Sequence, residues 1–96
     1  MNKLHIRREH TLGLLQMRKN AFGWAQYAET EYQMSCIYEE GDTKDTVLFN
    51  KSGVSGRLSI DHDTLEINIQ FGVLMTPFKK MIEGKILKNL DGILRK

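Results

Sequence analysis

The sequence predicts one α+β domain, residues 1–96, with a five-stranded, mainly antiparallel sheet and both helices on one face. Residues 65–71 alternate apolar and polar side chains, the period of a half-buried strand, and residues 76–94 carry an apolar stripe at helical spacing. Short alternating runs separated by polar or glycine-containing turns fill the middle of the chain. A chain of this size buries roughly 60–65% of its unfolded surface, which is enough for one modest core.

The N-terminal part predicts a short strand and a long helix. Leu4 and Ile6 alternate with charged residues, which indicates the strand. Thr11 is the expected N-cap of a helix that runs to Glu31. One side of this helix carries apolar or small side chains: Leu14, Met17, Ala21, Trp24, Ala25, Ala28 and Tyr32. This stripe outweighs the cost of about 1 kcal/mol for Gly23 in mid-helix.

Four strands and a second helix follow. The strands are expected at residues 34–39, 46–50, 54–60 and 65–71, with a polar turn at 40–45, and should pair as an antiparallel meander. Thr76 is the expected N-cap of the last helix, with Pro77 at its first position. The stripe of this helix, Phe78, Ile82, Ile86, Leu90 and Ile93, should pack on the sheet face that bears Leu58, Ile60, Ile67 and Ile69. A helix-grip arrangement, with the sheet curled round the last helix, fits this pattern best.

Composition and charge narrow the class of function. The net charge is only +2 and basic residues are interleaved with acids, so nothing indicates a nucleic-acid partner. Cys36 is the sole cysteine, which excludes an intramolecular disulfide. The first ten residues are charged without an apolar core, so no signal peptide is visible, and no apolar run is long enough to span a membrane. A cytoplasmic protein is expected.

Four motifs together resemble a known family. They are Ile6-x-x-x-His10-x-Leu12-Gly13, Phe49-x-x-Ser52-Gly53-Val54-x-Gly56, Phe71-Gly72-x-Leu74 with Pro77, and Ile82-Glu83. In this order they resemble the polyhydroxyalkanoic acid system proteins, small proteins encoded near genes for bacterial polyester storage granules. The resemblance covers nearly the whole chain and implies a setting in storage-polymer metabolism. It implies no catalytic residues.

No catalytic group, metal site or cofactor is expected from the residues themselves. The turn around His62 lacks the ligand spacing of a metal site, and His5 and His10 lie on other elements. Cys36 falls within a predicted strand, where a structural thiol is favoured over a nucleophile. Gly53 and Gly56 fit turns and bulges better than a phosphate loop, because no helix with a lysine follows them.

Glu83 lies at the border of the apolar stripe of the last helix. A carboxylate in such a place should be paired, and we expect a structural ion pair with Arg7, Arg18 or His10 from the N-terminal part. The alternative, an acid/base role, would need a second titratable group and a pocket.

Two apolar residues, Leu15 and Phe22, lie outside the stripe of the first helix. They predict either a contact surface, for a homodimer or a protein partner, or simple packing on the helix flank. Both interpretations stay open at this point.

The function expected first is that of a non-enzymatic accessory or granule-associated protein of polyhydroxyalkanoate metabolism. It would bind a granule protein or the polymer itself through apolar surface. The alternative is a binder of a small apolar ligand, held between sheet and helices in a cavity lined by Trp24, Phe78 and Met81. An enzyme would need polar residues converging inside that cavity, and the sequence shows none.

Overall fold

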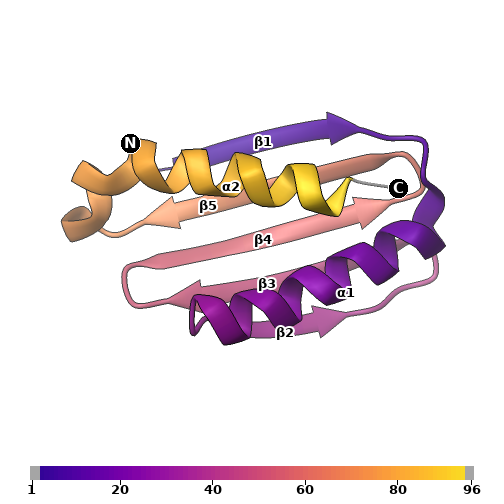
Figure 1. The fold of residues 1–96 in the computed structure, drawn as a ribbon, viewed down its shortest axis with the longest axis horizontal. Coiled ribbons are helices and arrows are strands. Elements are labelled where there is room, and N and C mark those ends of the chain that lie inside the picture. The colour runs from indigo at the N-terminus through magenta and orange to yellow at the C-terminus, as the bar shows by residue number, and fades with distance from the viewer. Residues whose placement is uncertain (1–2, 95–96) are drawn as a thin grey trace.

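The structure is a computed structural model that describes residues 3–94 as a sheet layer and a helix layer (Figure 1). The elements follow the predicted order β-α-β-β-β-β-α, which confirms the α+β class. Their bounds are β1 Lys3–Glu9, α1 Gly13–Glu31, β2 Ser35–Glu39, β3 Lys44–Lys51, β4 Val54–Asp61, β5 Thr64–Phe71, the 3-10 helix η1 Val73–Phe78, and α2 Lys79–Ile93.

The sheet has the strand order β1-β5-β4-β3-β2, and every neighbouring pair is antiparallel. Strands β2 to β5 form the expected meander. Strand β1 pairs with β5 along its whole length, from Lys3 opposite Gln70 to Glu9 opposite Thr64. The first strand of the chain therefore lies beside the last one, and β1 and β2 form the two edges of the sheet.

Both helices cover the same face of the sheet, as predicted. Figure 1 shows α2 in front of β1 and β5, and α1 in front of β3 and β2. Each helix thus covers its own half of the sheet, and the helix-grip comparison is not confirmed. The other face of the sheet is left open by both helices.

The core lies between the sheet and the helices. Alternate residues of the three central strands supply most of it: Val47, Phe49, Leu58, Ile60, Leu65, Ile67, Ile69 and Phe71. Helix α2 contributes Leu90 and Ile93, which are fully buried, and Ile82 and Ile86, which are half-buried. Phe78 was expected in this stripe but is 47% exposed, because it precedes the first turn of α2.

Both helices begin later than the sequence predicts, which corrects the expected N-caps. Leu12 holds the N-cap position of α1 and makes no side-chain cap hydrogen bond; its backbone N–H donates to Nδ1 of His10 (3.2 Å). Thr76 and Pro77 lie inside η1, so neither takes the place expected for it at the start of α2.

Gly53 fixes the position of η1 against the turn between β3 and β4. Its carbonyl oxygen accepts a hydrogen bond from the backbone N–H of Gly72 (2.8 Å). Its φ of +83° is a conformation that side chains disfavour, and a Cβ atom there would lie 2.6 Å from Cγ of Met75. Gly53 of the Ser52-Gly53 motif therefore holds the segment that connects β5 to α2 in place.

Leu90→Ala should lower the free energy of unfolding by about 2–5 kcal/mol, because it opens a cavity where α2 meets the sheet. Ile86→Ala on the same helix is the control, since Ile86 is half-buried and its truncation should cost less. Chemical denaturation of both variants measures the difference. An Ile86→Ala variant that loses as much stability as Leu90→Ala would contradict this packing.

Candidate functional site

Asp45 is a buried carboxylate at the centre of a polar network between α1 and the sheet. Its side chain has no exposed surface. It accepts hydrogen bonds from Nε and Nη2 of Arg18 (2.7 and 2.9 Å), from the hydroxyl of Tyr38 (2.6 Å) and from the backbone N–H of Gly41 (3.1 Å). Four donors satisfy a carboxylate, which has about four acceptor positions. The network joins α1, β2, the following turn and β3.

The protonation states within this network are held by its hydrogen bonds. Burial alone would raise the pKa of Asp45, but the hydrogen bonds from Arg18, Tyr38 and Gly41 outweigh it and hold that pKa below its usual value. Burial raises the pKa of Tyr38, and the hydrogen bond to Asp45 raises it further. The hydrogen bond to Asp45 also raises the pKa of Arg18. At neutral pH the group is a charged pair with a neutral tyrosine.

The structure does not form the ion pair predicted for Glu83. Within residues 3–94 no ion pair reaches Glu83, and Arg18 pairs with Asp45 instead. Arg7 contacts a neighbour on its own strand, and Nδ1 of His10 accepts a backbone N–H. Arg18, one of the three cations expected for Glu83, pairs with Asp45 because Asp45 is buried beneath α1, whereas Glu83 is only partly buried on α2.

The thiol and the histidines show no sign of catalytic activation or metal binding in the described residues. Burial raises the pKa of Cys36, which is opposite to the shift of an activated thiol. Nε2 of His5 contacts Oε2 of Glu66 on the neighbouring strand (2.6 Å). Among the residues described, no group of three or more potential ligands is arranged to hold a metal ion. No helix in the described part of the chain is long and apolar enough to cross a membrane.

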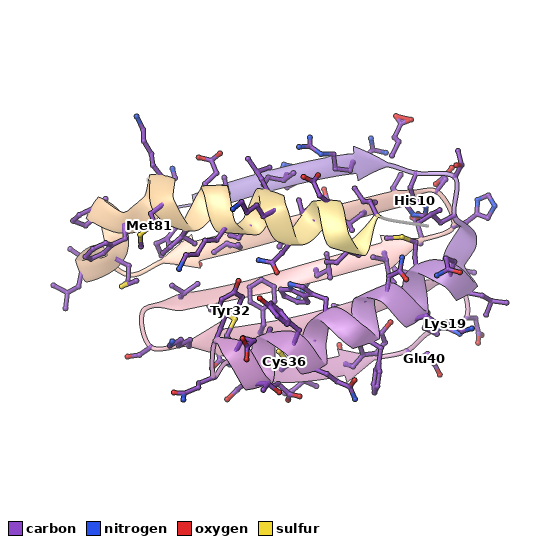
Figure 2. The ribbon with its side chains drawn as sticks, in the orientation of Figure 1. His10, Lys19, Tyr32, Cys36, Glu40 and Met81 are labelled. Atoms are coloured by element: carbon purple, nitrogen blue, oxygen red, sulfur yellow. The ribbon has the colours of Figure 1, made fainter. Side chains whose placement is uncertain are left out.

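Leu15 and Phe22 line one groove between α1 and β2, here named the α1 groove. Leu15 is 76% exposed, and the Phe22 ring packs edge-to-face on Tyr38, with centroids 5.7 Å apart. The other lining residues are Gln16, Arg18, Lys19 and Glu40. Figure 2 shows Lys19 and Glu40 at the end of the molecule away from Met81. Phe22 thus serves partly as flank packing, and binding of a partner here stays a prediction.

A cavity of about 230 Å³, here named the helix–sheet cavity, lies between the two helices and the sheet. Its apolar lining includes Trp24, Phe49, Val54, Ile67, Ile69, Met75, Ile82 and Ile86. Its polar lining is Tyr32, Lys51, Ser52, Lys85 and Asn89. Trp24 was expected here, and its ring packs edge-to-face on Phe49 (centroids 5.4 Å apart). Phe78 and Met81 were also expected here but do not line it, because both precede or open α2 and point to solvent.

Four exposed apolar side chains gather on η1 and the first turn of α2, and we name them the apolar tip. They are Val73 (81% exposed), Leu74 (88%), Phe78 (47%) and Met81 (56%). Figure 2 shows Met81 near the start of α2, at one end of the long axis of the molecule. Residues 70–82 include Lys79 and Lys80 and no acidic residue. The tip is therefore apolar with a basic border.

The sequence analysis did not identify Asp45, or Val73 and Leu74 of the apolar tip, as site residues. A sequence pattern that could have identified them was present in both cases. Asp45 was assigned to a turn, yet it precedes Val47 and Phe49 by two and four residues and so shares their inward face. Val73 and Leu74 belong to an apolar run that is too short to span a membrane, and Leu74 belongs to one of the family motifs, but neither was predicted to form an exposed contact surface. Their place between the fifth strand and the helix, next to Gly72, would have indicated an exposed connection.

The comparison with protein families gave one match. The family model described as "putative polyhydroxyalkanoic acid system protein" matches residues 4–94. The comparison with curated proteins gave no match. The matched segment contains every element described above except Lys3, the first residue of β1, and it contains the α1 groove, the helix–sheet cavity and the apolar tip.

Asp45→Asn should lower the free energy of unfolding at pH 7 by about 1–3 kcal/mol, because Arg18 loses its buried counter-ion. The pKa of Asp45 is lower in the folded protein than in the unfolded chain. The stabilisation is therefore complete above about pH 4 and is lost as the pH falls through the folded value.

Denaturation of wild type and Asp45→Asn between pH 7 and pH 2 measures this. Their difference should shrink only at the acid end. Glu40→Gln is the control, since Glu40 also contacts Arg18 (3.1 Å) but is largely exposed and should cost under about 1 kcal/mol. A difference independent of pH would show that the charge of Asp45 does not stabilise the fold.

Proposed function

This chain belongs to the polyhydroxyalkanoic acid system protein family, and we propose that it is a non-enzymatic accessory protein that attaches to cytoplasmic polyester granules. The attachment is made by the apolar tip, and the surface that it contacts is the polymer itself. The family membership supports a role in polyester storage. The exposed side chains of the apolar tip support direct binding to the polymer.

The observation that carries the proposal is the exposure of the apolar tip. Val73 and Leu74 are the most exposed of the large hydrophobic residues among the described part of the chain. Single exposed apolar residues need no explanation, but four on adjoining turns form a patch of the kind that marks an interaction site. Their neighbour Met75 is held against the Gly53 turn, so the patch is presented by a fixed backbone rather than a free tail.

The chemistry of the tip fits a polyester surface. Apolar side chains are driven onto such a surface by the water that they displace. Ester carbonyl oxygens accept hydrogen bonds, and the ammonium groups of Lys79 and Lys80 can donate them at the border of the contact. Glu83 lies one helical turn beyond Lys79, but within residues 3–94 neither lysine takes part in an ion pair.

The double variant Val73→Ser, Leu74→Ser tests the proposal. Both side chains are exposed, so folding should be little affected, and affinity for granules should fall by at least about tenfold because burial of two aliphatic side chains is lost. The measurement is the fraction of protein that sediments with isolated granules and, separately, with protein-free polymer particles.

Leu15→Ser, Phe22→Ser is the matched control, since it removes two apolar side chains from the α1 groove instead. We expect this variant to sediment like wild type with polymer particles. If the tip variant stays bound and the groove variant is released, attachment passes through the α1 groove and the proposal is wrong. Binding to granules but not to bare polymer would likewise overturn it, since a granule protein would then be the partner.

A further inference from the structure

We propose that the helix–sheet cavity is a binding site for a medium-chain aliphatic carboxylate. The hydrocarbon chain lies between the sheet and the helices, and the carboxylate lies at the lysines of the rim. This inference does not rest on granule attachment, because the cavity and the apolar tip share no lining residue.

The walls of the cavity select an apolar chain of limited length. Sheet residues such as Ile67 and Ile69 form one wall, and Ile82 and Ile86 of α2 form another. The volume is about 230 Å³. An apolar cavity of roughly 150 Å³ in another protein accepts benzene, so this one has room for a somewhat larger aliphatic group. It is small beside sites for whole drug-sized ligands, which start at roughly 300 Å³.

The rim of the cavity selects an anion. Lys51 comes from the end of β3 and Lys85 from α2, and the lining contains no Asp or Glu. Within residues 3–94 neither lysine takes part in an ion pair. Two cations without a counter-ion at the mouth of an apolar cavity match a ligand with an apolar chain and a carboxylate head.

Trp24 supplies a second, independent indication of a ligand. Its Nε1–H is buried and has no hydrogen-bond partner within the described chain. An unpaired buried donor is costly and is rarely left so without a reason. Trp24 lines the cavity, and in the proposed complex a carboxylate oxygen of the ligand accepts this hydrogen bond while the lysines neutralise the charge. Tyr32 and Asn89 also line the cavity, and Nδ2 of Asn89 on α2 donates to the hydroxyl of Tyr32, the C-cap residue of α1, at 3.3 Å.

Octanoate is the probe, and Trp24, the sole tryptophan of the chain, is the reporter. Titration should change the tryptophan fluorescence with saturation at one octanoate per protein, and calorimetry should give the same stoichiometry. Octanol and octylamine, which share the chain but lack the negative charge, should bind about three- to tenfold more weakly. No saturable binding of octanoate, or equal binding of the alcohol or the amine, overturns the proposal.

The double variant Lys51→Glu, Lys85→Glu should weaken octanoate binding by about tenfold or more while leaving octanol binding unchanged. The control Lys19→Glu, Lys44→Glu makes the same change in net charge at exposed lysines outside the cavity and should bind octanoate like wild type. Val73→Ser, Leu74→Ser should also bind normally. If the rim variant binds octanoate as tightly as wild type, or if the tip variant loses binding, the cavity is not the site.

Discussion

The ion pair between Arg18 and Asp45 is the contact on which the arrangement of the helix layer depends. The inner face of α1 carries Ala21, Ala25 and Ala28, which bring the helix close to the sheet but bury little apolar area. The two parallel hydrogen bonds from Arg18 to the fully buried Asp45 carboxylate fix the position of α1 along the sheet. Alanine side chains make no such directional contact. The same carboxylate holds β2 through Tyr38, so a break at this point would leave an uncompensated buried charge and loosen two elements at once.

The two helices meet at one end and are separated by the cavity toward the other. Near the ion pair, Nδ2 of Asn20 donates to the backbone oxygen of Ile93 (2.7 Å), so α1 lies directly against the end of α2. Farther along α1, the ring of Trp24 packs edge-to-face on Phe49 of β3, and both residues line the helix–sheet cavity. The molecule therefore carries a polar network at one end and, at the other, an apolar cavity and the exposed η1 segment.

The sequence was sufficient to predict the strands and helices, which follow from local periodicity. It was insufficient to predict contacts between residues that are far apart in the chain. Alternation predicted the strands, and the helical stripes predicted α1, α2 and their common face, because these periods are local. The pairing of β1 with β5 and the choice of Asp45 by Arg18 are set by three-dimensional packing and leave no fixed spacing in the sequence. Phe78 and Met81 were misplaced because the 3-10 turn delays the start of α2, which turns the first residues of the stripe away from the sheet.

The pairing of β1 with β5 also fixes the order in which the domain can form during synthesis. Strand β1 has no partner until residues 64–71 have been made, while β2 to β5 can pair as consecutive hairpins. Leu4 and Ile6 are exposed throughout that interval. A chain truncated before β5 keeps an unpaired strand with apolar side chains, which is a template for aggregation. Strand β5 is thus needed to protect β1, which is made some sixty residues earlier.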